Sequence, residues 1–317
     1  MGIKSPEDKL MEPFPLILES VKDLSKVQVQ SVFKLAHRFK KGDFSSIRPK
    51  NSSQRPLVAT FFQEPSTRTK NSFAIAAKRL NFEHVDLSPE NSSLKKGEDL
   101  EQTFLTLKYQ GVNLLVSRSP QERMIQDIKM PKMAYINGGD GKNQHPTQAL
   151  LDVFTMIEKG LDLSKATIAI IGDVLHSRVA HSLMDLIPQF GGRILLCGPD
   201  EWLPEGDLGP LIEKSNSLDD VILRSDVLYP LRIQKERHLK KGQVDHQFSD
   251  RYKISLKKLN QLKRSPLVFH AGPFNIGVEI DKDILESPLF QAYEQIENSV
   301  HLRMSLIQMM LESLRQS

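Results

Sequence analysis

The chain has 317 residues, of which 39% are hydrophobic and 26% charged, with a formal net charge of +4 and one cysteine. This composition is typical of folded globular proteins and excludes disordered, fibrous and disulfide-rich classes. The length exceeds what one hydrophobic core usually serves, so two domains of about 150 residues each are predicted. The chain has no signal-peptide pattern and no run of about 18 apolar residues, and we expect a cytoplasmic protein without membrane association.

The first half of the chain alternates helical and strand patterns. Residues 23–39 place apolar side chains on one helical face behind Ser25, a candidate N-cap. The apolar run at residues 57–62 predicts a buried strand, and a helical pattern follows it as far as Leu80. Further strands are predicted at 114–116 and 134–136, and a further helix at 147–157.

The second half starts a new series of apolar runs. Residues 166–173 form a near-continuous apolar run of the kind that buried parallel strands show. Cys197 ends another such run and is predicted to be a buried strand residue. Further strands are predicted at 193–197, 227–231 and 267–270, and a long amphipathic helix at about 289–314.

Strands that alternate with helices predict an α/β protein with two domains, each a parallel sheet flanked by helices, joined by bridging helices. The expected domains are residues 1–157 and 158–288. The C-terminal helix, about 289–317, is expected to pack back onto the first domain.

Hydroxyl and guanidinium side chains gather where the first predicted strand meets its helix. Residues 66–69 are Ser-Thr-Arg-Thr and follow the strand at 57–62. A helix N-terminus, hydroxyl groups and a guanidinium fork all favour a phosphate dianion. The alternative is an ordinary Ser/Thr helix cap beside a solvated arginine. Because these four residues are consecutive in the sequence and follow a buried strand, anion binding is the favoured interpretation.

A second motif, His-Pro-Thr-Gln at residues 145–148, follows the glycine-rich run at 137–141. Together with Ser-Thr-Arg-Thr it resembles the aspartate and ornithine carbamoyltransferase family, and the likeness covers nearly the whole chain. The resemblance implies that the first domain binds carbamoyl phosphate and the second aspartate. It also implies that His145 donates a hydrogen bond to the carbamoyl oxygen, Gln148 holds the carbamoyl NH₂ group, and Arg118 contacts phosphate and carbonyl. Without the family likeness, His145 would be an ordinary surface histidine.

Residues 92–98, Ser-Ser-Leu-Lys-Lys-Gly-Glu, resemble the mobile loop that in this family reaches into the neighbouring subunit's active site. Ser92 and Lys96 are the matching positions, and a slip of one residue to Ser93 and Lys95 stays open. The resemblance implies a homotrimer with shared active sites, in which the lysine bridges phosphate and the aspartate carboxylate. Without the likeness, this segment is a solvated polar loop.

Two arginines of the second half match the family's acceptor-binding positions. In residues 172–182 the matching arginine is Arg178, which is implied to bind the α-carboxylate of aspartate. In residues 231–237, Arg232 is implied to bind the side-chain carboxylate, and Gln234 to help place the amine. Two guanidinium forks suit a short dicarboxylate, whereas an ornithine enzyme must accommodate a distal ammonium group.

Residues 269–280 resemble the family segment His-Pro-x-Pro followed by Asn-Arg-Gly-Val-Glu-Ile, with two departures. Ala271 replaces the usual proline and Ile276 replaces the usual arginine. Gly272 and Pro273, where the family has a cis bond, are retained, and a carbonyl near Gly272 is implied to accept a hydrogen bond from the carbamoyl NH₂ group. The absence of a His-Cys-Leu-Pro sequence speaks against ornithine as the substrate.

The implied reaction needs positioning and electrostatic stabilisation rather than covalent help, because carbamoyl phosphate is already an activated anhydride. The residues assigned to catalysis are Arg68, Thr69, Lys96, Arg118 and His145. The residues assigned to carbamoyl phosphate are Ser66, Thr67, Arg68, Thr69, Ser92, Lys96, Arg118, His145, Gln148, Gly272 and Pro273. The residues assigned to L-aspartate are Lys96, Arg178, Arg232 and Gln234. The sequence has no metal-ligand cluster, dinucleotide motif or Walker loop, so no metal or other cofactor is expected.

Two alternatives stay open at this point, and a third is set aside. One is a catalytically inactive homologue that serves as a structural partner in a pyrimidine-pathway complex, and another is a carbamoyltransferase for a different amino acid such as ornithine. A nucleic-acid-binding protein would depend on the basic clusters at 235–241 and 257–264, but these lack interleaved aromatic residues, and no nucleic-acid partner is expected. A regulatory chain or a dihydroorotase is left open as a partner.

Overall fold

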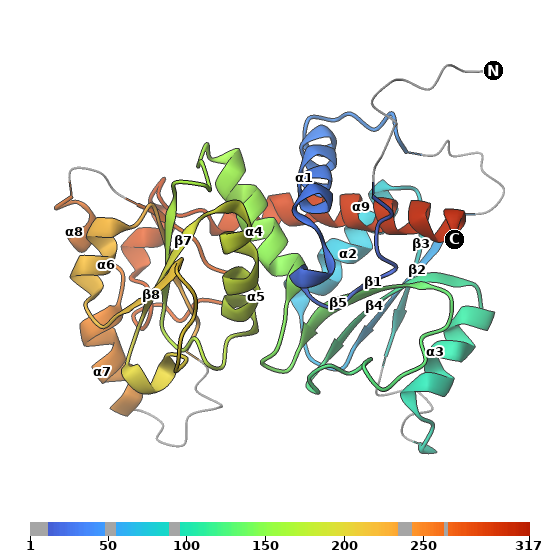
Figure 1. The fold of residues 1–317 in the computed structure, drawn as a ribbon, viewed down its shortest axis with the longest axis horizontal. Coiled ribbons are helices and arrows are strands. Elements are labelled where there is room, and N and C mark those ends of the chain that lie inside the picture. The colour runs from blue at the N-terminus through green and yellow to red at the C-terminus, as the bar shows by residue number, and fades with distance from the viewer. Residues whose placement is uncertain (1–11, 48–54, 89–95, 234–242, 263–265) are drawn as a thin grey trace. The chain divides into compact units, whose positions relative to one another are not determined.

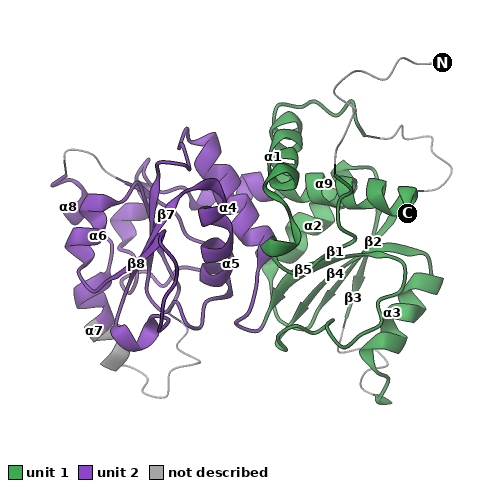
Figure 2. Ribbon diagram, viewed as in Figure 1, with its two compact units in different colours: residues 1–140, 300–317 green, residues 141–299 purple. Residues whose placement is uncertain are grey.

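The computed structural model describes residues 12–47, 55–88, 96–233, 243–262 and 266–317. The chain forms two compact units (Figure 2). Unit 1 comprises Met1–Asp140 and Val300–Ser317, and unit 2 comprises Gly141–Ser299. None of the helices in the described ranges is long and apolar enough to cross a membrane.

Unit 1 contains a sheet of five parallel strands in the order β1-β5-β4-β2-β3. The strands are β1 (Ile17–Leu18), β2 (Leu57–Phe62), β3 (Glu83–Leu87), β4 (Val112–Ser119) and β5 (Ala134–Asp140). The chain runs outward from β2 to β3, then returns to β4 on the other side of β2 and continues to β5. The winding direction therefore reverses between β2 and β4, and the carboxyl ends of these two strands form the switch point of the sheet.

Helices cover both faces of this sheet (Figure 1). They are η2 (Val21–Asp23), α1 (Lys26–Lys40), α2 (Thr67–Arg79), α3 (Leu100–Tyr109) and the part of α9 (Ala292–Gln316) that follows residue 299. Phe104 and Leu107 of α3 share a core cluster with Ala59 of β2, and α1, α2 and α9 lie on the opposite face. The predicted N-cap is confirmed, because the Ser25 hydroxyl accepts from the Gln28 N–H at 3.2 Å while the Gln28 side chain accepts from the Ser25 N–H at 2.8 Å.

Unit 2 contains a second sheet of five parallel strands, in the order β10-β9-β6-β7-β8. The strands are β6 (Thr167–Ile171), β7 (Arg193–Cys197), β8 (Ile212–Ser215), β9 (Val227–Pro230) and β10 (Leu267–Val268). The winding again reverses, this time between β6 and β9. The carboxyl ends of β6 and β9 are therefore the switch point of the second sheet.

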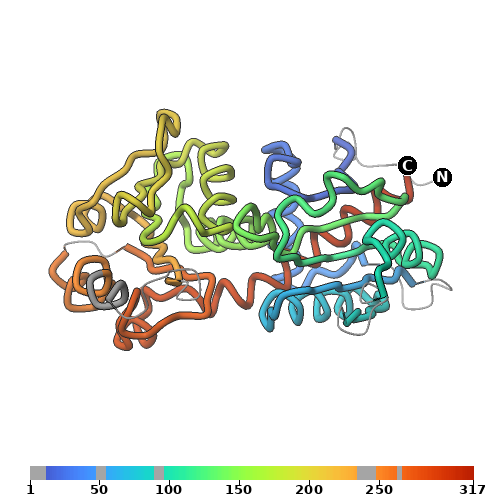
Figure 3. Tube along the Cα trace, turned by 90° about the horizontal axis from the view of Figure 1, so that it is seen from below, coloured from blue at the N-terminus to red at the C-terminus, as the bar shows by residue number. Residues whose placement is uncertain are grey.

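The helices of unit 2 precede, connect or follow these strands along the chain, whose path can be followed in Figure 3. They are α4 (Pro146–Glu158), α5 (Arg178–Leu186), η5 (Ile187–Phe190), η6 (Asp200–Trp202), α6 (Leu218–Arg224), α7 (Gln243–Tyr252), α8 (Leu256–Leu259), η7 (Lys282–Glu286) and the start of α9. One core cluster contains Ala169 of β6, Val221 of α6 and Phe248 of α7. Cys197 is fully buried in the same cluster as predicted, and burial raises the pKa of its thiol to about 12. This thiol is therefore a packing group and not a nucleophile.

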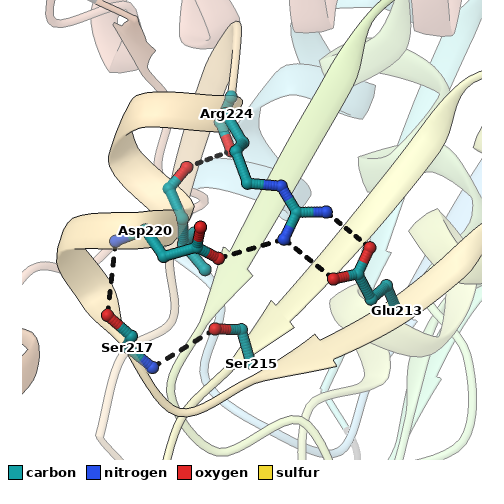
Figure 4. A network of polar contacts seen from close by, with 7 residues as sticks. Glu213, Ser215, Ser217, Asp220 and Arg224 are labelled. Atoms are coloured by element: carbon teal, nitrogen blue, oxygen red, sulfur yellow. Dashed lines mark hydrogen bonds and ion pairs between the residues drawn. The ribbon is translucent and has the colours of Figure 1, made fainter.

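A polar network on the surface of unit 2 joins β8 to α6 (Figure 4). The Arg224 guanidinium donates to both carboxylate oxygens of Glu213 and, at 3.0 Å, to Asp220. The hydrogen bonds from Arg224 hold the pKa of Glu213 below its ordinary value. The side chains of Arg224 and Glu213 are 41% and 55% exposed, so solvent screens this ion pair and it adds little to stability. Arg224 is thus a surface arginine whose contacts are local.

The predicted fold class is confirmed, since the structure has two parallel five-stranded sheets flanked by helices. Strands β1, β3 and β8 were not predicted from the sequence. Each is the outer strand of its sheet; β1 has only two residues, and the exposed positions of β3 and β8 carry charged side chains. The compact units change at Asp140 and at Ser299, and the domain boundaries predicted at 157 and 288 stay predictions.

Candidate active site

The Ser-Thr-Arg-Thr motif lies where β2 ends and α2 begins. The ends of β2 and β4 are neighbours, because Phe62 pairs with Arg118 and the Gln63 N–H donates to the Arg118 carbonyl at 2.8 Å. In open parallel sheets, ligands bind outside the carboxyl ends of the strands at the switch point. Residues 66–69 and Arg118 are therefore placed where the topology of the first sheet favours a ligand. These five residues are called the phosphate cradle below.

Two side chains orient Arg118 within the phosphate cradle. Its Nε donates to Glu64 Oε2 at 3.0 Å, and its Nη1 donates to Ser66 Oγ at 3.2 Å. The side chains of Arg118 and Glu64 are only 15% and 23% exposed. Ser66 is the N-cap residue of α2, but its hydroxyl makes no capping hydrogen bond. The arrangement joins a guanidinium, a hydroxyl and a helix N-terminus without a side-chain cap, which together suit a phosphate.

The first turn of α2 is braced from its buried side. The Ser72 hydroxyl donates to the Thr69 carbonyl at 2.8 Å, and the buried Arg303 of α9 donates to the Ser72 hydroxyl. The Arg303 guanidinium also lies over the Phe73 ring, 4.9 Å from its centroid. Thr69 is buried while Arg68 is exposed. The brace therefore fixes the backbone of the turn and leaves the Arg68 side chain on its outer side.

In unit 2, Arg178 stands at the end of the loop that follows β6. The loop is folded by Asp173, whose Oδ1 accepts from the His176 N–H at 3.2 Å and from His176 Nδ1 at 2.8 Å. The Ser177 hydroxyl then caps α5, and Arg178 is the first residue of that helix. The Arg178 Nη1 donates to the Gly141 carbonyl at 3.2 Å. Arg178 is thus held close to the carboxyl end of β6.

Arg232 follows β9, the second strand of the same switch point. The Leu231 N–H donates to the Ile171 carbonyl at 2.7 Å, which extends the pairing of β9 with β6. On the other side of Arg232, the Ile233 carbonyl accepts from Asn275 Nδ2 at 3.1 Å. The backbone on both sides of Arg232 is therefore fixed. The two arginines predicted to bind aspartate follow the two strands at the switch point of the second sheet.

His145 and Gln148 stand in the N-terminal turn of α4. The His145 N–H donates to the Ser182 hydroxyl at 2.9 Å, and that hydroxyl donates to Gln144 Oε1 at 2.5 Å. Ser182 belongs to α5, so this helix holds the backbone that precedes α4. His145 and Gln148 are 4% and 8% exposed. The sequence alone suggested a surface histidine when the family was left aside, and the structure shows a buried and braced one.

The segment from His270 to Ile280 forms a turn that two buried side chains stabilise. His270 Nδ1 accepts from the Gly272 N–H at 2.8 Å, so the ring hydrogen is on Nε2, which faces Glu279 Oε1 at 3.4 Å. The Glu279 carboxylate also accepts from the Asn275 N–H. The Gly272-Pro273 peptide bond is cis, which confirms the prediction. Ile276, which replaces the usual arginine, is 53% exposed and adds no charge to the turn.

Part of the predicted site lies outside the described residues, namely Ser92, Ser93, Lys95 and Gln234. Lys96 is described and is exposed, shortly before α3. Within the described ranges, no group of three or more His, Cys, Asp and Glu side chains is placed to hold a metal ion.

Three residues that hold the predicted site residues in place were not predicted from the sequence. They are Glu64, which orients Arg118; Ser182, which binds the His145 backbone; and Asp152, which accepts from Gln148 Nε2 at 2.8 Å. Only Asp152 had a signal in the sequence, because it follows Gln148 by four residues on a predicted helix and so lies on the same helical face. The other two contacts depend on tertiary structure.

Family profiles match both halves of the chain. The profile described as "Aspartate/ornithine carbamoyltransferase, carbamoyl-P binding domain" matches residues 18–158. The profile described as "Aspartate/ornithine carbamoyltransferase, Asp/Orn binding domain" matches residues 164–310. Together the two profiles account for most of the chain.

Individual relatives agree with the profiles. The aspartate carbamoyltransferase catalytic subunit of Staphylococcus carnosus is 36% identical over 291 residues, which are 92% of this chain and 93% of the relative. The corresponding subunit of Carboxydothermus hydrogenoformans is 36% identical over 296 residues, with coverage of 92% and 94%. The aspartate transcarbamoylase of Trypanosoma cruzi, solved with carbamoyl aspartate and phosphate, superposes with a TM-score of 0.80 at 28% identity and covers 95% of this chain and 99% of its own. The chain therefore belongs to the aspartate/ornithine carbamoyltransferase family.

Proposed function

We propose that the protein transfers the carbamoyl group of carbamoyl phosphate to the α-amino group of L-aspartate and releases phosphate. The observation that carries this proposal is the pair Arg178 and Arg232, which follow β6 and β9 at the switch point of the second sheet. Two guanidinium groups at one ligand position match the two carboxylates of aspartate. Ornithine would instead need a negative partner for its distal ammonium group.

Carbamoyl phosphate is divided between two sets of side chains in this proposal. The phosphate cradle binds the phosphoryl oxygens, with the first-turn amides of α2 and the Arg68 guanidinium as the main donors. His145 donates to the carbamoyl oxygen, and Gln148 accepts from the carbamoyl NH₂ group together with a carbonyl near Gly272. The buried position of His145 and Gln148 supports this assignment, because hydrogen bonds discriminate best where water is excluded.

Aspartate is bound through its carboxylates. Arg178 takes the α-carboxylate and Arg232 the side-chain carboxylate, while Gln234 helps to place the amine. Lys96 contacts both aspartate and phosphate, and we assign it, with Ser92, to the neighbouring subunit of a homotrimer. The product, N-carbamoyl-L-aspartate, enters pyrimidine biosynthesis, and we infer a cytoplasmic location.

The chemistry is nucleophilic addition followed by elimination. The neutral aspartate nitrogen attacks the carbamoyl carbon, and the carbonyl electron pair moves to the oxygen, where His145, Thr69 and Arg118 stabilise the negative charge. The electron pair then returns, the bond from carbon to the phosphate oxygen breaks, and the departing phosphate accepts the proton that the nitrogen loses. No protein base is needed, because the leaving group is itself basic enough to take the proton. The protein contributes orientation and charge stabilisation.

A product assay tests the proposed activity. Purified protein is incubated with carbamoyl phosphate and L-aspartate, and N-carbamoyl-L-aspartate and phosphate are quantified together. The proposal predicts equal amounts of the two products, with none formed when aspartate is omitted beyond the spontaneous decay of carbamoyl phosphate. A folded protein that forms no carbamoyl aspartate would instead be an inactive homologue with a structural role.

Replacing Arg232 separates the binding of the two substrates. Arg232→Ala should raise the KM for aspartate by about 100-fold, because a bidentate hydrogen bond from a guanidinium to a desolvated carboxylate contributes about 3 kcal/mol of binding free energy. The KM for carbamoyl phosphate should change by less than about threefold, since that substrate has no second carboxylate. Steady-state kinetics with each substrate varied in turn measures both values. Arg224→Ala is the matched control in the same unit, because it removes one arginine from the surface network of Figure 4 and should leave both KM values unchanged. Equal changes in the two KM values in Arg232→Ala would remove Arg232 from the aspartate site.

A further inference from the structure

A buried carboxylate lies directly behind Gln148. Asp152 has no exposed surface and stands one helical turn after Gln148 on α4. Its Oδ1 accepts from Gln148 Nε2 at 2.8 Å and from Gln295 Nε2 at 2.6 Å. Its Oδ2 accepts from the Tyr229 hydroxyl at 2.6 Å. Three donors therefore surround one carboxylate, as a buried negative charge requires.

The chemistry of these groups fixes the orientation of the Gln148 amide. A carboxylate can only accept hydrogen bonds, so the Gln148 NH₂ group must face Asp152, and its carbonyl oxygen must point away from it. Burial, followed by the Asp152 charge, holds the pKa of Tyr229 well above its ordinary value, so the Tyr229 hydroxyl keeps its proton and stays a donor. The buried network therefore has a single consistent arrangement of hydrogens.

The same carboxylate is connected to the turn at residues 270–273. Gln295 donates to Asp152 through its NH₂ group and accepts from the His270 N–H at 2.9 Å through its carbonyl oxygen. The next residues of that turn include Gly272, whose neighbourhood supplies the second proposed acceptor for the carbamoyl NH₂ group. One buried carboxylate thus supports both groups that would accept hydrogen bonds from the substrate NH₂.

We propose that Asp152, supported by Tyr229 and Gln295, is a positioning residue that makes the site selective for a carbamoyl group over an acetyl group. The proposal rests on the function proposed above. Acetyl phosphate has the shape of carbamoyl phosphate but carries CH₃ in place of NH₂, so it cannot donate to Gln148 Oε1 or to the turn carbonyl. A site that hydrogen-bonds an NH group rejects an analogue without it by about 10⁴-fold, because its buried acceptors are left without donors.

Replacing Asp152 with asparagine should reduce this selectivity. The new asparagine side chain presents an NH₂ group as well as an oxygen, and a Gln148 amide that turns to accept from it directs its own NH₂ group towards the substrate. We expect Asp152→Asn to lower kcat/KM for carbamoyl phosphate by about 100-fold, while the aspartate-dependent rate with acetyl phosphate changes by less than about threefold. The KM for aspartate should be unchanged. If Asp152 had a purely structural role, the variant would instead lower the rates with carbamoyl phosphate and with acetyl phosphate by the same factor.

Two further variants keep the test decisive. Tyr229→Phe removes one hydrogen-bond donor from Asp152 but leaves the contact between Asp152 and Gln148, so this variant should fold. It should lower the ratio of kcat/KM for carbamoyl phosphate to kcat/KM for acetyl phosphate by about tenfold. Asp226→Asn is the matched control, because Asp226 accepts from the Thr167 N–H at the amino end of β6, away from the switch point. Its ratio should equal that of the wild type.

The outcomes separate the inference from the proposed function. A wild-type protein that forms no carbamoyl aspartate would refute the proposed function itself. Suppose that the wild type is active but that the ratio of kcat/KM for carbamoyl phosphate to kcat/KM for acetyl phosphate is unchanged in folded Tyr229→Phe, and in Asp152→Asn if that variant folds. This result would overturn the role of Asp152 alone. A ratio that falls in both variants and stays constant in Asp226→Asn is the result that the inference requires.

Discussion

Arg68→Ala should reduce turnover by about 10²–10³-fold or more while the protein remains folded. Arg68 is in the first turn of α2, whose backbone is held from the buried side by Ser72 and Arg303. The exposed guanidinium takes no part in that brace, so its loss should leave the turn in place. Removing one preorganised donor from a developing charge costs about 3 kcal/mol or more. Steady-state kinetics with saturating aspartate, together with circular dichroism of the folded variant, measures both expectations.

The same helix supplies the control for this prediction. Lys78→Ala removes one exposed positive charge from the last turn of α2 and should leave kcat within about twofold of the wild type. Arg68→Lys keeps the charge but loses the planar fork, and its rate should lie between those of the wild type and Arg68→Ala. Normal turnover in folded Arg68→Ala would mean that the phosphate cradle is not the phosphate site.

Mixing two inactive variants should restore activity if the sites are shared between subunits. We propose that Lys96 acts in the site of the adjacent chain and Arg68 in the site of its own chain. A head-to-tail contact of this kind must close into a ring or form an open polymer, and a closed trimer is the smallest unit that we propose. Lys96→Ala and Arg68→Ala are unfolded together and refolded. Each mixed trimer then contains one site that has both wild-type residues, so random mixing in equal amounts should restore about a quarter of the wild-type activity.

Controls for subunit exchange make this result interpretable. Each variant refolded alone should stay inactive, and wild-type protein taken through the same procedure should recover its activity. Native mass spectrometry with one variant carrying a mass tag shows whether mixed trimers are present. If mixed trimers form without any recovery, Lys96 and Arg68 act within one chain, and the shared-site proposal is wrong.

The central strands of both sheets were predicted well, because fully buried strands leave a strong signal in the sequence. The runs at 57–62 and 193–197 coincide with β2 and β7, which are apolar along most of their length and lie inside their sheets. The outer strand β3 was missed, since Glu83 and Asp86 are exposed and break the apolar pattern. The pattern of apolar residues along a sequence shows which segments are buried. Outer strands have too few buried positions to produce such a pattern.

The residues that support the site were largely invisible in the sequence. Arg303 is almost completely buried, yet charged residues are normally predicted to lie on the surface. Its partner Ser72 is 231 residues away along the chain, so no local pattern connects the two. The phosphate motif at residues 66–69 could be proposed from its chemistry, whereas the other substrate residues were assigned through the family resemblance. The groups that orient them depend on tertiary contacts that a single sequence does not contain.

The central claim is that this protein carbamoylates aspartate, and a competition between acceptors tests it most directly. Carbamoyl phosphate labelled in its carbonyl carbon is supplied to the purified protein with equal concentrations of L-aspartate and L-ornithine, and the labelled products are separated and counted. The paired arginines Arg178 and Arg232 predict that nearly all the transferred label appears in N-carbamoyl-L-aspartate and that citrulline stays at the level of the protein-free control. Label transferred mainly to ornithine, or to neither acceptor, would contradict the account.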